Sequence, residues 1–150
     1  MQPPPAAGAH SYPSRGPPLP VEVVRLLGRG NFITRIFEVK SEESIVVYGL
    51  GRPKEIRLPR EVIEWMVDSY PITRILEEAI NHYSFRRRLS HPGAIRSLIL
   101  LLYARGRGEP PYKVARRYGI APEQLYRMER GLKKDGMYEF VMNALSLASG

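Results

Sequence analysis

The feature that most constrains the fold is a change of residue pattern at Pro59. Before it, four stretches rich in β-branched and aromatic residues are separated by turns of three or four residues. Connections this short favour antiparallel pairing of neighbouring strands. After Pro59 the apolar residues recur at helical spacing. The sequence therefore predicts an α+β fold, with a small antiparallel four-stranded β-meander followed by helices. The predicted strands are Val21–Leu27, Phe32–Lys40, Ile45–Leu50 and Lys54–Leu58.

Prolines and apolar spacing divide the second part of the chain into helices. Pro59 suits the start of a helix over Arg60–Ser69, and Pro71 is expected to end it. A largely buried helix should begin at Pro92, with Ser90 as its cap, and reach about residue 105. The last helix should cover about residues 137–148. Between the first and the buried helix lies an apolar stripe at helical spacing: Ile72, Ile75, Leu76, Ala79, Ile80 and Tyr83.

Composition divides the chain into three predicted regions. Half of its 14 prolines lie in the first 20 residues, so residues 1–19 are expected to form a disordered tail. Residues 20–90, the β-meander and two helices, should form a platform for dimerisation or for a partner. Residues 91–150 should form a helical nucleic-acid-binding region with a C-terminal helix.

The net charge of +8, with a pI of about 10.0, favours polyanions as partners. Residues 91–150 contain ten basic and five acidic residues, a net charge of +5, whereas residues 59–90 contain five of each. The excess positive charge is thus concentrated in the last third of the chain.

The sequence indicates neither an enzyme nor a cofactor-dependent protein. The chain has no cysteine, and His10, His82 and His91 do not have the spacing of metal ligands. Its two aspartates, Asp68 and Asp135, are far apart, and no nucleophile motif is present. We therefore expect no catalytic residues, no bound metal and no cofactor. The N-terminus has no signal-peptide pattern, which favours a cytoplasmic, nucleoid-associated protein.

Residues 111–134 fit the requirements of two short helices that cross through a tight turn. Ala115 is small enough for the crossing, Gly119 tolerates a positive φ in the turn, and Pro122 suits the start of the second helix. Val114, Tyr118, Ile120, Leu125 and Met128 can share one core. This segment resembles the helix-turn-helix superfamily of DNA-binding proteins. A plain three-helix core with a basic surface is the other interpretation.

The resemblance implies that the second helix enters the major groove of duplex DNA. Its expected base-reading residues are Ala121, Glu123, Tyr126, Arg127 and Arg130. The expected phosphate contacts are Lys113, Arg116, Arg117, Lys133 and Lys134. The run Arg86, Arg87 and Arg88, which is next to Tyr83 and Phe85, is also expected to contact phosphates. The alternative interpretation of this run is a solvated loop. A sequence-specific transcriptional regulator acting as a homodimer is the function that this implies.

Two alternatives remain open on the sequence. The predicted sheet mixes basic and aromatic residues, Arg25, Phe32, Arg35, Tyr48 and Arg57, and could bind single-stranded DNA or RNA. In the order of its elements the chain is similar to a thermophilic archaeal family of single-stranded-DNA-binding proteins. Alternatively, the protein is a non-enzymatic interaction adaptor whose basic charge is incidental.

Overall fold

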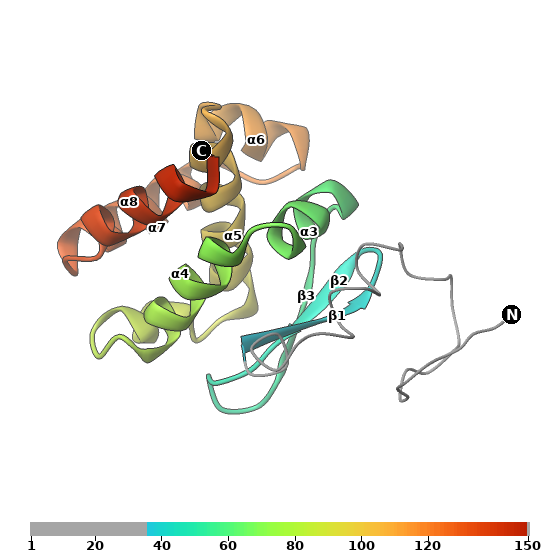
Figure 1. Cartoon of the computed structure of the whole chain (residues 1–150), viewed down its shortest axis with the longest axis horizontal. Helices are drawn as coiled ribbons and strands as arrows, with labels where there is room; N and C mark the ends of the chain where they lie inside the picture. Colours follow the sequence, from blue (N-terminus) through green and yellow to red (C-terminus); the bar gives the residue numbers. More distant parts are fainter. Residues whose placement is uncertain (1–35, 150) are drawn as a thin grey trace, which may run out of the picture.

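The computed structural model describes residues 36–149 of the chain. Within this range a three-stranded antiparallel sheet precedes six α-helices and one short 3-10 helix, which confirms the α+β class. The elements are β1 (Phe37–Ser41), β2 (Ser44–Val47), β3 (Lys54–Arg57), α3 (Arg60–Val67), α4 (Tyr70–Asn81), the 3-10 helix η2 (Phe85–Leu89), α5 (Pro92–Arg107), α6 (Pro111–Arg117), α7 (Pro122–Lys134) and α8 (Tyr138–Ser149). Figure 1 shows the sheet on one side of the helices.

The sheet has the order β1-β2-β3, as a meander requires. Two of the predicted strands, Ile45–Leu50 and Lys54–Leu58, lie within the described residues and correspond to β2 and β3. The strand predicted over Phe32–Lys40 lies only partly within them, where β1 begins at Phe37, and the strand predicted over Val21–Leu27 lies outside them. The strand predicted over Ile45–Leu50 ends earlier, at Val47, because Gly49 adopts a φ of +99° in the following turn. The expected turn at residues 41–44 joins β1 to β2.

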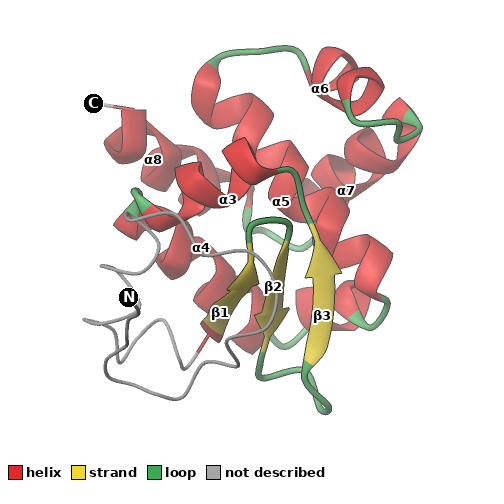
Figure 2. Cartoon of the chain, turned by 90° about the vertical axis from the view of Figure 1, so that its right-hand side faces the viewer, coloured by secondary structure: helices red, strands yellow, loops and turns green. Residues whose placement is uncertain are grey.

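One face of the sheet forms part of the core. Paired residues on it are Val39 with Ile45 and Ile45 with Ile56, and all three are buried. This alternation of buried and outward residues follows the period of two along a strand. β3 packs against α5, so the sheet covers one side of that helix. Figure 2 shows the sheet in front of α4 and α5.

Helix α5 is the centre of the described fold. Residues 97–104 are all buried, which confirms that this apolar run belongs to the core. The helix ends at Gly108, whose φ of +73° gives a left-handed cap. Ser90 was expected to cap the start of α5. Instead, His91 is the N-cap, and its side chain accepts a hydrogen bond from the Gly93 amide.

Helix α3 begins at Arg60, as expected, directly after Pro59, whose backbone is extended. Two other predictions about the first two helices are wrong. Helix α3 ends at Val67, and Pro71, which was expected to end it, lies in the first turn of α4, where a proline loses no helical hydrogen bond. Tyr83 does not extend the apolar stripe of α4, because that helix ends at Asn81 and the Tyr83 side chain is 91% exposed.

One hydrophobic core joins residues on both sides of the boundary predicted at residue 90. It extends from Ile36 to Leu145, with α4 packed against α8 and β3 against α5. The helices predicted for DNA binding are therefore supported by the sheet and α4 through α5 and α8.

Candidate nucleic-acid interface

Helices α6 and α7 are joined by a turn of four residues, 118–121. Gly119 has a φ of +73°, as the motif requires, and its amide donates to the Arg116 carbonyl. The Ile120 amide donates to the Ala115 carbonyl at 2.8 Å, which closes the end of α6. Pro122 then begins α7, as expected. The turn thus fixes the direction in which α7 leaves α6.

Helices α5, α6 and α7 pack against one another in pairs. Val114, Ala115 and Leu125 are fully buried between them, and Ile120 and Met128 are also buried. Of the five residues expected in this shared core, only Tyr118 is half-buried. Its hydroxyl leaves the core and donates to Glu61 of α3 at 2.7 Å. The three helices therefore have a common core, and Tyr118 connects the turn to α3.

A buried ion pair holds α7 against α5. Arg105 donates to both carboxylate oxygens of Glu129, at 2.8 and 2.9 Å. The Glu129 side chain is only 7% exposed and that of Arg105 is 34% exposed. Two parallel charge-assisted bonds fix both distance and orientation. No local sequence pattern predicts this pair, because its members lie 24 residues apart on separate helices.

The outward face of α7 carries four charged residues. Glu123, Arg127, Arg130 and Lys134 recur at intervals of four, three and four, and all are exposed. On the opposite face, Leu125 and other apolar residues are buried. This arrangement gives α7 one basic face that contains a single acidic residue.

The expected base-reading residues are not equivalent in the structure. Ala121, Glu123, Arg127 and Arg130 are exposed, whereas Tyr126 is half-buried. Arg130 forms an ion pair with Glu123, two turns earlier on the same helix. This hydrogen bond lowers the pKa of the Glu123 carboxyl below its ordinary value. Arg130 therefore extends along the surface toward the N-terminal end of α7.

All eight expected phosphate contacts are exposed, and four of them form one group on α6 and α7: Lys113, Arg116, Lys133 and Lys134. None of the four is in an ion pair with a residue of the described range. The Arg116 guanidinium lies 5.3 Å from the Tyr112 ring centre, and the Lys133 ammonium 4.8 Å from that of Tyr138. Arg117 differs, because it is paired with Glu109 at 2.8 Å.

The run Arg86–Arg88 forms the 3-10 helix η2 and not an irregular loop. Arg88 is held by Asp135, to which it donates at 2.7 Å. It also lies across Gly131 of α7, where an added Cβ would be 2.9 Å from the Arg88 side chain. Arg88 therefore connects η2 to the end of α7, while Arg86 and Arg87 face solvent.

A second feature that the sequence did not indicate is a cleft of about 420 Å³ between the start of α5 and α7. Arg127 lines it from α7, beside Gln124, and Arg88 and His91 line it from the other side. Arg127 thus lies at the edge of a hollow and not on a flat helix surface.

The sheet has few of the features expected of a single-strand platform in its described part. Tyr48 donates to Glu38 at 2.8 Å, and Arg57 is paired with Glu43 at 2.9 Å. Phe37, an aromatic residue of β1, is fully buried in the core. Arg25, Phe32 and Arg35 lie outside the described residues.

No helix within residues 36–149 is long and apolar enough to cross a membrane. No protein-family model, curated protein or solved structure matches this chain.

Proposed function

We propose that this protein binds duplex DNA, with α7 in the major groove and α6 across the backbone. The observation that carries the proposal is the division of α7 into two faces. Its apolar face is buried against α5 and α6, whereas Arg127, Arg130 and Lys134 are exposed on the other. A helix held in this way presents arginines in the arrangement used to read guanine edges.

The state of the cations supports the same proposal. Lys113 and Arg116 of α6 and Lys133 and Lys134 of α7 are exposed and have no ion-pair partner in the described part of the chain. Cations of this kind gain most from a phosphate, since no internal bond has to be broken. Arg117 and Arg88 are already paired with carboxylates, so they should contribute less than the sequence implies.

A homodimer is part of the proposal, because one helix offers few base contacts and two half-sites double them. Leu147 of α8 is 77% exposed, and Phe140 and Ala144 on the same helix face are half-buried. This face is our candidate for the contact between two copies. A dimer that reads a two-fold symmetric site would suit a sequence-specific transcriptional regulator.

The test compares two double variants that remove the same charge. Duplexes are first selected from a random library by the wild-type protein. Binding is then measured by fluorescence anisotropy for Arg127→Ala/Arg130→Ala and for Arg52→Ala/Arg74→Ala. The second pair is exposed and lies outside α6 and α7. We expect the first pair to weaken binding at least about 10-fold, since a bidentate arginine–guanine contact contributes about 1–3 kcal/mol.

Equal loss in both double variants would show that only overall charge matters and would contradict the proposal. Duplex binding that survives the α7 changes would do the same. Failure to bind any nucleic acid at low salt, where phosphate attraction is strongest, would instead favour the interaction adaptor.

A further inference from the structure

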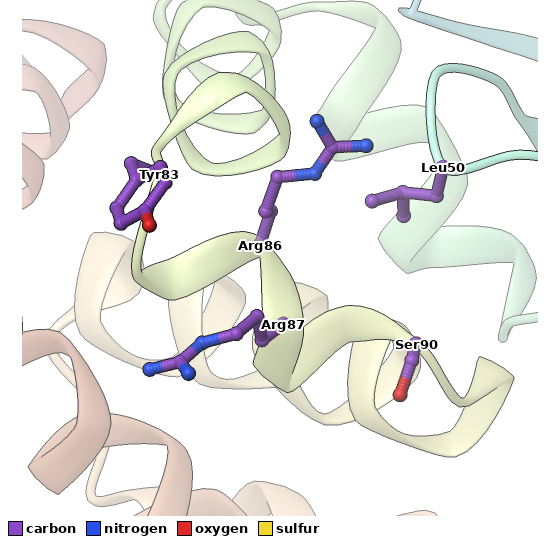
Figure 3. A pocket seen from close by; sticks show the side chains of 5 residues that line it. All are labelled: Leu50, Tyr83, Arg86, Arg87 and Ser90. Atoms are coloured by element: carbon purple, nitrogen blue, oxygen red, sulfur yellow. The ribbon is translucent and has the colours of Figure 1, made fainter.

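A pocket of about 500 Å³ lies around the start of η2, and no α7 residue is among those that line it. It is lined by Leu50 from the turn after β2, Tyr83 and Ser90 from either side of η2, and Arg86 and Arg87 from η2 itself. Figure 3 shows these five side chains. The pocket therefore combines one exposed aromatic ring, two guanidinium groups, a hydroxyl and one apolar side chain.

Tyr83 is exposed although the backbone around it is well anchored. Its side chain is 91% exposed, whereas Phe85, two residues later, is fully buried. The His82 Nδ1 atom accepts hydrogen bonds from the amides of Ser84 and Phe85, at 3.2 and 3.0 Å. These bonds order the turn that presents Tyr83. A large ring that is this exposed adds little to folding, so it is available to a ligand.

Arg86 and Arg87 have unused hydrogen-bond donors. The Arg86 guanidinium donates only to the Gly49 carbonyl, at 3.4 Å, and the Arg87 guanidinium only to the Ser84 carbonyl, at 3.3 Å, among the bonds within residues 36–149. Neither is paired with a carboxylate of that range, and Asp135, the acid of this region, is taken by Arg88. An arginine has five N–H donors, so most of those on both residues remain available to an anion.

The two guanidinium groups point in different directions. In Figure 3 Arg86 extends toward the loop that carries Leu50, whereas Arg87 and Tyr83 extend on the other side of η2. A single phosphate would engage one of them. Two phosphates separated along a chain would engage both, and a base beside the phosphate at Arg87 would lie on the side of η2 that carries the Tyr83 ring. The arrangement fits a short segment of strand better than a single anion.

We propose that this pocket binds an unpaired segment of nucleic acid. Tyr83 stacks on a base, and Arg86 and Arg87 contact two different phosphates of the strand. Stacking on an aromatic ring is tolerant of sequence, so the site should not select a base strongly. This surface is separate from α7, and the proposal does not depend on duplex reading. The protein would then hold a single-stranded segment at η2, whether or not α7 reads a duplex.

The experiment measures anisotropy of a short labelled oligothymidine with the full-length protein. The variants are Tyr83→Ala, Tyr83→Phe and Arg86→Ala/Arg87→Ala, with Arg52→Ala/Arg74→Ala as an exposed control that removes the same charge outside the pocket. We expect Tyr83→Ala to weaken binding about 10-fold, because stacking contributes about 1–3 kcal/mol per base. Tyr83→Phe should bind as the wild type does, and Arg86→Ala/Arg87→Ala should bind more weakly than Arg52→Ala/Arg74→Ala.

Tyr83→Ala changes no charge, and the side chain is too exposed for the substitution to unfold the protein. Wild-type affinity in Tyr83→Ala, or no binding of oligothymidine by the wild type, would overturn the proposal. Thymidine monophosphate is measured in parallel. If it binds as tightly as the strand, with the same dependence on Tyr83, the ligand is a free nucleotide and the strand assignment is overturned. The duplex measurements on α7 are separate, so either proposal can fail alone.

Discussion

The Arg105–Glu129 pair allows a prediction about how α7 is held in place. Its two partners differ in solvent access, since the Glu129 side chain is 7% exposed and the Arg105 side chain is 34% exposed. Removing either one leaves the other without its charged partner. The remaining charge is costly only where water cannot reach it. The two single substitutions should therefore have unequal effects on stability.

We estimate the two effects from methionine substitutions, which keep the aliphatic part of each side chain. Arg105→Met leaves a buried carboxylate without its partner, and breaking such a pair costs about 3–5 kcal/mol. Glu129→Met leaves a guanidinium that can turn to water, so we expect about 1–2 kcal/mol for the two lost bonds. The double variant should recover most of the wild-type stability, because an apolar pair of similar size fits the site.

The assay is equilibrium unfolding in urea at neutral pH for both single variants and the double variant. Glu139→Met on α8 is the matched control, because Glu139 is exposed and its change should stay within about 0.5 kcal/mol. If Glu129→Met is as destabilising as Arg105→Met, or the double variant is the least stable, unequal desolvation is not what controls this contact.

Three further predictions concern the connections of α6 and α7. Gly119→Ala should lower the free energy of unfolding in urea by about 1–2 kcal/mol, since a φ of +73° is strained for any residue with a Cβ, although space is open there. An unchanged free energy of unfolding would show that the turn relaxes. Tyr118→Phe should cost about 1 kcal/mol and raise the pKa of Glu61 toward its ordinary value, because the Tyr118 hydrogen bond is the main cause that lowers it; an NMR titration that finds the Glu61 pKa unchanged would contradict this. The hydrogen bond from Arg88 lowers the pKa of the Asp135 carboxyl. The contribution of this contact to the stability of the fold is therefore present above about pH 4 and is lost as the pH falls through the folded-state pKa of Asp135. The stability difference between wild type and Asp135→Asn should therefore shrink in acid, and a difference that is constant with pH would refute the assignment.

Local patterns were sufficient to predict most of the described fold. Apolar spacing and the prolines located the helices to within a few residues, and the turn at Gly119 followed from the need for positive φ. The errors at Ser90 and Pro71 were also local. Two adjacent residues could each cap α5, and a proline can begin one helix as readily as it ends another.

Contacts between distant segments could not be predicted in the same way. Arg88 and Asp135 lie 47 residues apart, and their contact depends on how η2 meets the end of α7. The exposure of Tyr83 depends on α4 ending at Asn81, although the apolar spacing continues past it. Arginines that could contact a phosphate or a base could thus be named from the sequence, but the sequence did not show which of them form ion pairs within the protein.

The distribution of ion pairs changes the meaning of the net charge. Glu109, Glu123 and Glu129 are each paired with an arginine. Each of these carboxylates therefore neutralises one particular arginine and does not reduce the charge of the other cations in the last third of the chain. The cations of α6 and α7 that have no ion-pair partner within residues 36–149 are Lys113, Arg116, Arg127, Lys133 and Lys134, so a charge of +5 is concentrated on these two helices.

If α7 reads duplex DNA as we propose, the ion pair between Arg130 and Glu123 should affect which bases are bound. The pair joins two side chains that are 62% and 58% exposed, and exposed pairs contribute only about 0–1 kcal/mol. A guanine contact contributes about 1–3 kcal/mol, so a correct base can displace Glu123, whereas a base without the matching acceptors cannot. Glu123 would then increase discrimination at the position that Arg130 reads, at a small loss of affinity. Glu123→Gln should consequently bind all duplexes more tightly and separate good sites from poor ones less well.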